Sequence, residues 1–191
     1  QLDELLISHA DADHAGGAQA ILNALDVRRV VSGQPEAHPT HFSAQACLEE
    51  HWQWDEVQFW RWQWPHARDS NQKSCVLLIE AQGERLLLTG DLDTAGEAAL
   101  LKHWPWLQAD WLVAGHHGSR TSTSRRFVQA IAPKYALISR GKHNSYGHPH
   151  PQVIRTLQRA EVVVYDTAID KAVLVHLGAQ QPPWTMAEQS R

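Results

Sequence analysis

Four side chains that commonly bind metals lie within six consecutive residues near the start of the chain: His9, Asp11, Asp13 and His14. Histidine and aspartate are ordinary ligands of Zn²⁺, Mn²⁺ and iron. The apolar run 5–7 before them predicts a buried strand, so a short loop can turn the first two side chains toward one metal and the next two toward a second. A hydrophilic loop with a helix-capping aspartate is the alternative, and this density of ligands argues against it.

Two further groups follow predicted strands. Asp91 follows the run 85–89 and Gly90, and a carboxylate at a strand tip can bridge two cations that offset its desolvation. His116 and His117 follow the predicted strand 111–114. A turn aspartate and a packed histidine pair are the plain alternatives. Because α/β proteins place their sites at strand tips, we expect all three groups to converge on a two-metal centre.

Charge is distributed unevenly along the chain, although its net value is only −4. The segment 116–160 contains no Asp or Glu. Its basic residues are Arg120, Arg125, Arg126, Lys134, Arg140, Lys142, Arg155 and Arg159. Such segregation can build one positive face on an acidic protein, and a chance solvated surface explains it equally well.

The elements that position these groups alternate between strands and helices, which predicts a mixed α/β domain. We expect strands at 5–7, 29–32, 57–64, 75–80, 85–89, 111–114, 135–139, 162–165 and 172–177. We expect helices at 15–25, 43–50, 95–103, 123–131 and 151–159. Trp60, Trp62 and Trp64 alternate along one strand, which is typical of sheet packing rather than base stacking. Cys47 and Cys75 can either pair or stay free.

The order of the motifs resembles the metallo-β-lactamase superfamily. More narrowly, it resembles the metallo-β-lactamase-like domain of ComEC-type competence proteins, the DNA-uptake channels of naturally transformable bacteria. The matching stretches are Ser8–Gly17, Asn71–Leu77, Leu86–Leu92, His116–Ser119 and Ser139–Pro151. The resemblance implies an αββα sandwich over residues 1–179 that is incomplete at its N-terminus, with some N-terminal strands missing, and we expect 180–191 to be a disordered tail. It also implies a membrane channel region that this chain does not carry.

The chain departs from the commonest superfamily pattern, HxHxDH, in its first metal site. Asp11 stands at the second histidine position, and no histidine lies near 71–75. Both changes make the first site poorer in nitrogen, and ComEC-like proteins share the substitution. We therefore expect two divalent ions, either Mn²⁺ or Zn²⁺, with Mn²⁺ or a loosely held first ion favoured over two tightly bound Zn²⁺ ions.

The resemblance implies phosphodiester hydrolysis by a deoxyribonuclease that degrades one strand of incoming DNA at the periplasmic face of the inner membrane. It assigns His9 and Asp11 to the first metal, Asp13 and His14 to the second, and Asp91 to a bridge. His117 would complete the second site, and His116 would contact phosphate. Asp13, Asp91 and His148 form the expected catalytic set, with His148 stabilising the scissile phosphate or protonating the leaving group. The expected DNA contacts are Ser119, Arg120, Lys142, Asn144 and Tyr146.

Two other functions remain open. One is a hydrolase of the same fold acting on a small phosphodiester or phosphocholine-like ester, and the charge segregation favours a polyanion over such a substrate. The other is a non-catalytic DNA-binding domain that has lost its metals. The presence of Asp13, His14 and Asp91 argues against that possibility.

Overall fold

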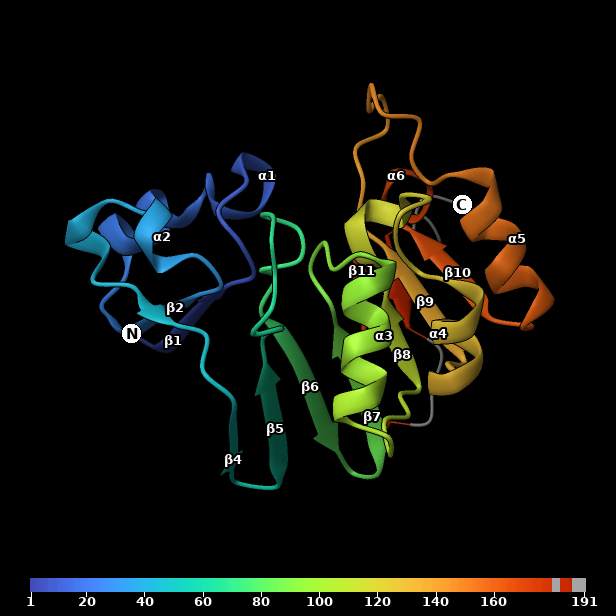
Figure 1. The fold of residues 1–191 in the computed structure, drawn as a ribbon, viewed down its shortest axis with the longest axis horizontal. Helices are drawn as coiled ribbons and strands as arrows, with labels where there is room; N and C mark the ends of the chain where they lie inside the picture. The colour runs from blue at the N-terminus through green and yellow to red at the C-terminus, as the bar shows by residue number, and fades with distance from the viewer. Residues whose placement is uncertain (180–182, 187–191) are drawn as a thin grey trace.

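The computed structural model describes residues 1–179 and 183–186, whose strands form two large sheets and a small pair (Figure 1). The parallel three-stranded sheet contains β1 (Leu2–Ile7), β2 (Val27–Ser32) and β3 (Gln45–Ala46) in that order. The seven-stranded sheet has the order β10-β9-β8-β7-β6-β5-β4. Its strands are β4 (Glu50–Trp54), β5 (Val57–Trp62), β6 (Val76–Ala81), β7 (Glu84–Leu88), β8 (Trp111–Val113), β9 (Tyr135–Ile138) and β10 (Val163–Asp166). The small antiparallel pair is β11 (Val173–Leu174) with β12 (Trp184–Thr185).

Helices connect the strands and cover the sheets. They are α1 (Ala12–Ala15), α2 (Ala18–Ala24), α3 (Thr94–His103), α4 (Arg125–Ile131), α5 (Pro151–Arg159) and α6 (Thr167–Asp170). Short 3₁₀ turns are η1 (Pro35–Ala37), η2 (Thr40–Phe42) and η3 (Gly115–Gly118). Strands β7 to β10 run parallel, whereas β4 to β7 are antiparallel. The carboxyl ends of β7 and β8 therefore lie at the same edge of the sheet.

One face of the seven-stranded sheet packs against helices. Leu78, Leu87 and Leu112 come from three adjacent strands and are completely buried against Leu100 of α3 and Phe127 of α4. Burying apolar side chains of this size contributes about 1.5–3 kcal/mol each. Helix α5 closes the β9 and β10 end of the same face through a second core.

Side chains that alternate along β1 show that the two sheets face each other. Leu5 and Ile7 point to one side, where they pack with α2. Leu6 points to the other side and lines a cavity together with Leu77 and Leu88 of the seven-stranded sheet. The layers therefore run from α2 through the two sheets to α3–α5, and the expected αββα sandwich is confirmed.

The predicted strand at 57–64 is confirmed over 57–62, and its tryptophans pack as expected. Trp62 is 3% exposed and belongs to the main core, against which Trp60 and Trp64 also pack. The other elements confirmed, with ends shifted by a few residues, are the strands near 5–7, 29–32, 75–80, 85–89, 111–114, 135–139 and 162–165 and the helices at 95–103, 123–131 and 151–159. The helix expected at 15–25 is split into α1 and α2 at the Gly16-Gly17 pair.

The helix predicted at 43–50 is wrong. Residues 45–46 form β3, which pairs with β2, and β4 begins at Glu50. The backbone N–H of Cys47 donates to the carbonyl of Ser32, and Cys47 is joined to Cys75 by a disulfide. Tertiary pairing and a covalent bond thus override a local composition that favours helix.

The chain end also differs from expectation. Only Val173–Leu174 of the strand predicted at 172–177 is extended, because its partner β12 has just two residues. β12 lies in the segment expected to be a disordered tail. The remainder of that tail, 180–182 and 187–191, lies outside the described residues. Within the described residues, no helix is long and apolar enough to cross a membrane.

Candidate metal centre

The candidate ligands gather where three strands end. His9 follows β1, Asp91 follows β7, and the His116-His117 pair lies in η3 after β8. Helix α1 supplies Asp13 and His14 from the turn after β1. The ligand-type side chains predicted from sequence therefore meet at one edge of the two sheets.

The turn that presents Asp91 leaves no space for a side chain before it. Gly90 has a φ of +55°, and a Cβ there would lie 2.8 Å from Oγ of Ser74 and 2.9 Å from Cβ of Ser8. The backbone N–H of Asp91 donates to Oγ of Ser74 over 2.9 Å. Glycine is thus required for β1 and β7 to approach closely enough to share the site.

The histidine pair is held in an uncommon backbone conformation. His116 has a φ of 50° and His117 a φ of 54°, followed by Gly118 at +82°. Left-handed backbone at non-glycine residues costs about 1–3 kcal/mol each and persists where the surroundings enforce it. Here the N–H of His116 donates to the carbonyl of Gly90, and that of Ser119 donates to the carbonyl of His116. The strained turn directs both imidazoles toward Asp91.

Asp91 lies at the centre of the cluster. Its Oδ1 is 3.1 Å from Nε2 of His14. Its Oδ2 is 3.8 Å from Nε2 of His9, 3.6 Å from that of His116 and 3.9 Å from that of His117. One carboxylate therefore reaches four imidazoles that come from both sheets.

Two overlapping groups of side chains have the spacing of metal sites. His9, His14 and Asp91 form the first, and Asp13, His14 and His117 form the second. Nε2 of His117 is 3.1 Å from Oδ2 of Asp13 and 3.2 Å from Nε2 of His14. Because the two groups share His14, the cluster is suited to two neighbouring cations.

Asp11 lies at the margin of the first group. Its Oδ2 is 3.4 Å from Nε2 of His9, and its side chain is 47% exposed. Neither Asp11 nor His116 belongs to the two groups with metal-site spacing. Asp11 is close enough to His9 to join a shared cation. Nε2 of His116 is 3.6 Å from Oδ2 of Asp91, but His116 does not share the spacing of either group.

Two buried polar atoms of the cluster have no hydrogen-bond partner among the described residues and fit a divalent cation. Nε2 of His9 and Oδ1 of Asp91 are buried, and neither makes a hydrogen bond of acceptable geometry within the described part of the chain. A buried donor or acceptor left in this way costs about 1–3 kcal/mol. Because both atoms point into the cluster, a divalent ion would satisfy them together, and the donor set of imidazoles and carboxylates fits such an ion.

Burial and neighbouring charges shift the pKa values of Asp91, His9 and His14. Burial disfavours the ionised carboxylate of Asp91, but the close approach of His14 and the charges of His116 and His117 outweigh burial and lower the pKa of Asp91. Burial lowers the pKa of His9, with help from repulsion by His14. For His14 burial is outweighed by Asp91 and Asp13, and its pKa is raised. An ionised Asp91 and a neutral His9 are the protonation states that metal ligation requires.

Hydrogen bonds at the outer nitrogens separate the roles of the two adjacent histidines. Nδ1 of His117 lies 2.8 Å from the carbonyl of Ser139, and a carbonyl can only accept, so Nδ1 carries the proton. When the ring is neutral, this proton position leaves a lone pair on Nε2, the atom that faces Asp13 and His14 and that a metal ligand would use. Nδ1 of His116 instead lies 3.4 Å from the amide nitrogen of Asn71 and 3.4 Å from Oγ1 of Thr121, and both can donate to it. His116 then carries its proton on Nε2, where it can donate to an anion.

Several residues that sequence reasoning did not single out support the ligands. Oγ of Ser8 lies 3.1 Å from Nδ1 of His9 and 3.0 Å from Nδ1 of His14. Oγ of Ser70 donates to Oδ1 of Asp11 over 2.6 Å. Ser70 is distant from Asp11 in sequence, and no local signal in the chain marks this contact.

The predicted DNA contacts fall into two classes. Ser119 is only 6% exposed, and its Oγ is 3.0 Å from that of Thr121. The amide of Asn144 donates to the carbonyl of His148 and accepts from its N–H. These two side chains hold their own loops and are not presented to a ligand, because their polar atoms are already paired.

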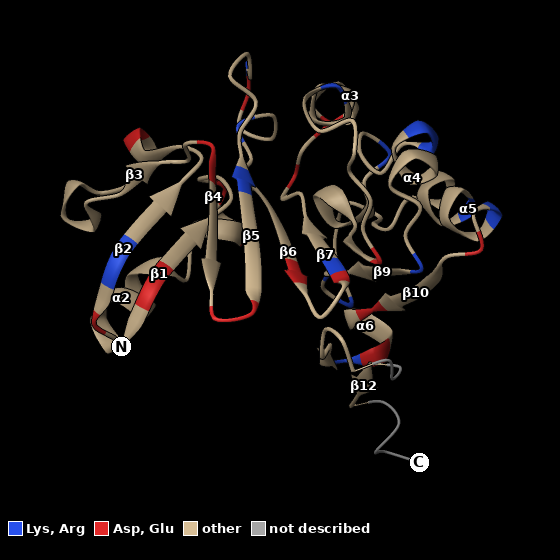
Figure 2. Ribbon diagram, turned by 90° about the horizontal axis from the view of Figure 1, so that it is seen from below, with Lys and Arg blue, Asp and Glu red and all other residues tan. Residues whose placement is uncertain are grey.

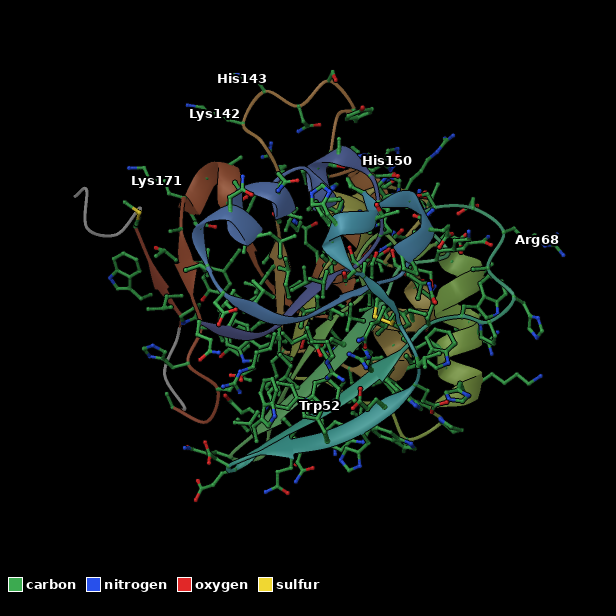
Figure 3. All side chains as sticks on the ribbon, turned by 90° about the vertical axis from the view of Figure 1, so that its left-hand side faces the viewer. Trp52, Arg68, Lys142, His143, His150 and Lys171 are labelled. Atoms are coloured by element: carbon green, nitrogen blue, oxygen red, sulfur yellow. A yellow bond between two sulfur atoms is a disulfide. The ribbon has the colours of Figure 1, made fainter. Side chains whose placement is uncertain are left out.

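The other predicted contacts reach solvent. Arg120, Lys142 and Tyr146 are exposed, and the loop carrying Lys142 projects from the body of the molecule (Figure 3). Tyr146 is 80% exposed and its ring stacks on that of His148, with centroids 5.8 Å apart. The ring of His148 is 5.7 Å from that of His116, so this loop borders the cluster.

A cavity opens beside the ligands. It has a volume of about 370 Å³ and includes Asp13, His14, Asp91 and His117 in its lining. Its apolar wall includes Leu6, Leu77, Leu88, Val113 and Ala114. Apolar surroundings strengthen interactions between charges, so the cluster is well placed to act on an anionic substrate.

Comparisons with known proteins agree with this geometry. Competence protein ComA of Neisseria gonorrhoeae is 41% identical over 182 residues, which cover 93% of this chain and 26% of ComA. ComE operon protein 3 of Bacillus subtilis is 38% identical, over 87% of this chain and 24% of its own length. Recombination protein 2 of Haemophilus influenzae is 33% identical, over 92% of this chain and 22% of its own length. The chain therefore spans about a quarter of the length of the curated relatives it matches, and the expected resemblance to ComEC-type competence proteins is confirmed.

Solved structures share the fold at low sequence identity. CmlA, a diiron β-hydroxylase from Streptomyces venezuelae, matches 87% of this chain and 43% of its own, with a TM-score of 0.58 and 13% identity. Igni18, a metallo hydrolase from Ignicoccus hospitalis, matches 96% of this chain and 78% of its own, with a TM-score of 0.52 and 13% identity. The profile of the Metallo-beta-lactamase superfamily matches residues 1–143. The chain belongs to the metallo-β-lactamase superfamily.

Proposed function

We propose that this domain is a metal-dependent phosphodiesterase that cleaves DNA and, within its full-length protein, degrades one strand of an incoming duplex. The observation that carries the proposal is the convergence of ligand atoms from three strand tips on Asp91. A centre with room for two cations is the standard device for hydrolysing phosphodiesters.

His9, Asp11 and Asp91 would hold the first ion, and Asp13, His14, His117 and Asp91 the second. Bound divalent ions lower the pKa of water and stabilise charge on a phosphate. The first set has one imidazole, which favours Mn²⁺ there, whereas the second set has two and suits Mn²⁺ or Zn²⁺.

Residues around the cluster would position the substrate. His116 has its Nε2 proton directed toward the centre, 3.6 Å from Asp91, and would donate to a phosphate oxygen. His148 borders His116 and would protonate the leaving oxygen or hold the scissile phosphate. Arg120 and Lys142 are exposed beside this region and would attract the polyanion.

The competence relatives support a role in DNA uptake by a longer, membrane-associated protein. We place this domain on the extracytoplasmic side of the membrane. The Cys47–Cys75 disulfide supports that location, because disulfides persist in oxidising compartments such as the bacterial periplasm.

The test is a nuclease assay with labelled single- and double-stranded DNA and with Mn²⁺, Zn²⁺ and Mg²⁺ titrated separately. We expect Asp91→Asn to reduce cleavage by at least about 1000-fold, since removing the bridging charge disrupts both cation sites. The matched control is Asp55→Asn, which removes an exposed carboxylate at a turn where asparagine accepts the left-handed backbone.

Cleavage by Asp91→Asn at the wild-type rate would remove Asp91 from the mechanism and overturn the proposal. The same preparations should be assayed on bis(p-nitrophenyl) phosphate. A wild-type protein that hydrolyses this small ester but no DNA would support the alternative of a small-phosphodiester hydrolase. DNA binding without hydrolysis of either substrate would support a non-catalytic binding domain.

A further inference from the structure

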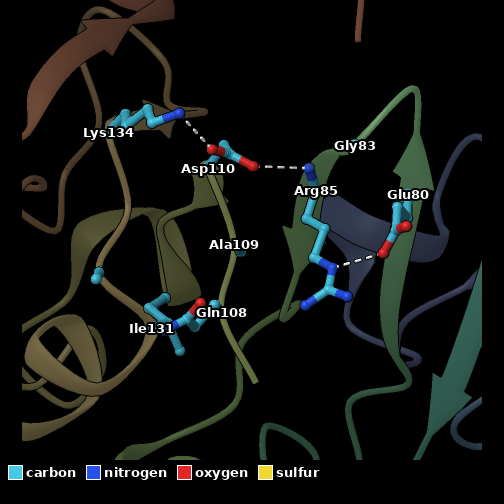
Figure 4. Close-up of a pocket in the computed structure, with 9 residues that line it drawn as sticks. Glu80, Gly83, Arg85, Gln108, Ala109, Asp110, Ile131 and Lys134 are labelled. Carbon is cyan, nitrogen blue, oxygen red and sulfur yellow. Dashed lines mark hydrogen bonds and ion pairs between the residues drawn. The ribbon is translucent and has the colours of Figure 1, made fainter. Parts of the chain in front are cut away.

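The acid-free segment 116–160 does not form one uniform positive surface. Nζ of Lys134 is 2.8 Å from Oδ1 of Asp110, on the edge of a pocket between β7 and the start of β9 (Figure 4). Nε of Arg140 is 2.8 Å from Oδ2 of Asp166. These two cations are neutralised within the fold.

Four arginines of the segment remain unpaired on two neighbouring helices. They are Arg125 and Arg126 of α4 and Arg155 and Arg159 of α5. All four are exposed, and none forms an ion pair with any residue that the structure describes. Figure 2 shows basic segments along α4 and α5, at the end of the molecule away from β1 and β2.

A groove of about 350 Å³ lies between these helices, and we call it the α4–α5 groove. Its lining consists of Arg125, Val128, Gln129, Thr156, Arg159 and Ala160. No carboxylate lines it, and the neighbouring Glu161 pairs with neither arginine in the described structure. Guanidinium groups, an amide and a hydroxyl facing one groove are donors suited to phosphate oxygens.

The groove is connected to the metal centre by the loops that begin its helices. Oγ of Ser124 caps α4, and Thr121 just before it contacts Nδ1 of His116. His150 caps α5, and its N–H donates to the carbonyl of Gly118 over 2.8 Å. Both helices therefore start beside the turn that carries His116 and His117.

The surface fits a nucleic-acid backbone better than a membrane. None of the large apolar side chains exposed on the described chain belongs to α4 or α5. The apolar residues of α5, including Val153 and Leu157, are buried in the core. A helix face with cations and no exposed apolar side chain cannot insert into a bilayer, whereas phosphate contacts need only the cations.

We propose that the α4–α5 groove is a second phosphate-backbone site, outside the metal centre, that holds a single-stranded polynucleotide while another part of it occupies the cluster. The choice of a polynucleotide rests on the proposed nuclease function. The groove adds affinity for long substrates and makes no contact with the scissile phosphate.

The test compares Arg125→Gln/Arg159→Gln with wild-type chain in binding a fluorescent 20-nucleotide oligo(dT) in EDTA, so that no cleavage occurs. Affinity should fall roughly tenfold or more near 100 mM salt, and the slope of log affinity against log salt should lose about 1.4, at about 0.7 for each phosphate contact. In metal-loaded assays the variant should raise KM for the oligonucleotide and leave kcat/KM for bis(p-nitrophenyl) phosphate unchanged.

The matched control is Arg68→Gln/Lys102→Gln, which removes the same charge from exposed side chains outside α4 and α5 that form no ion pair with the described residues. Equal losses of oligo(dT) affinity in the two double variants would overturn the groove proposal and indicate an effect of net charge. The proposal would also be overturned if Arg125→Gln/Arg159→Gln bound the oligonucleotide as wild type does but bound vesicles containing 30% phosphatidylglycerol more weakly. That result would indicate a membrane-binding surface. A wild-type chain that binds oligo(dT) through these arginines but cleaves nothing would refute the nuclease proposal and leave the groove standing.

Discussion

Asp91 is a buried carboxylate surrounded by imidazoles. It is 3% exposed, and isolated burial of a charge is very costly. Neighbouring histidines lower its pKa and keep it ionised, yet its Oδ1 still lacks a well-formed hydrogen bond among the described residues. A buried carboxylate that stays ionised beside four imidazoles has the properties of a metal ligand.

Ser8 is a positioning residue for two of the ligands. Its hydroxyl has one hydrogen, so it can donate to Nδ1 of one histidine and must accept from Nδ1 of the other. Ser8 thereby fixes the ring orientations of His9 and His14 together, as outer-shell hydrogen bonds do in metal sites.

We expect Ser8→Ala to weaken metal binding about 10- to 100-fold, the usual effect of losing an outer-shell partner. Isothermal titration of Mn²⁺ and Zn²⁺ into metal-free protein measures the change. Ser145→Ala removes an exposed hydroxyl and serves as the control. Loss of stability in the metal-free protein without loss of metal affinity would show that Ser8 is only a packing residue.

At the scale of elements, α3 braces the loop between the histidine turn and α4. Glu97 of α3 is 2% exposed and accepts hydrogen bonds from the backbone N–H groups of Thr123 and Ser124. The N–H of Thr94 also donates to the carbonyl of Thr121. The loop that follows His116 and His117 is thus tied to a helix that lies outside the cluster.

We expect Glu97→Gln to lower the free energy of unfolding by about 1–3 kcal/mol, because one backbone donor then faces an amide NH₂ group. Burial raises the pKa of Glu97, so its stabilising contribution is fully present below the ordinary glutamate pKa and is lost as pH rises through the folded-state value. The stability difference between wild type and variant should therefore narrow as pH rises above the ordinary glutamate pKa in urea titrations. A difference that widened with pH would show that the ionised form is the stabilised one.

At the scale of the whole molecule, the cluster joins two sheets that each supply part of the ligands. His9, Asp13 and His14 follow the three-stranded sheet, whereas Asp91 and His117 follow the seven-stranded sheet. The Cys47–Cys75 disulfide links the same two layers, and the N–H of Cys75 donates to the carbonyl of Ser8 next to the first ligand. The covalent link therefore holds together the two halves of the candidate centre.

Removing this link should destabilise the fold. For a sequence separation of 28 residues, closure of the loop is worth about 3.5 kcal/mol in the chain-entropy account. We expect reduction by phosphine to lower the free energy of unfolding by a comparable amount in guanidinium titrations. Cys47→Ser/Cys75→Ser should have the same free energy of unfolding as the reduced protein, and adding the reductant should not change it. If reductant changed this double variant equally, the effect would not come from the disulfide.

The sequence alone was sufficient for most elements and for the grouping of the ligands. The strands before His9, Asp91 and His116 could be predicted because buried strands are apolar runs. The carboxyl ends of parallel neighbours share an edge, which accounts for β7 and β8, whereas β1 lies in the other sheet. The order of the motifs also pointed to the correct superfamily. These local patterns are reliable because the apolar side chains of each segment are the ones that it buries in the folded protein.

Features that depend on contacts between distant segments of the chain were determined only by the tertiary structure. Pairing with β2 and a disulfide made 45–47 extended where composition favoured helix. The carbonyl of Ser139 and the amide of Asn71 distinguished His117 from His116. Folding also divided the basic segment, since Lys134 and Arg140 form ion pairs with Asp110 and Asp166, whereas the arginines of α4 and α5 form none with the described residues. Hydrogen bonds and ion pairs act over a few ångströms, and only the folded chain determines which atoms come that close.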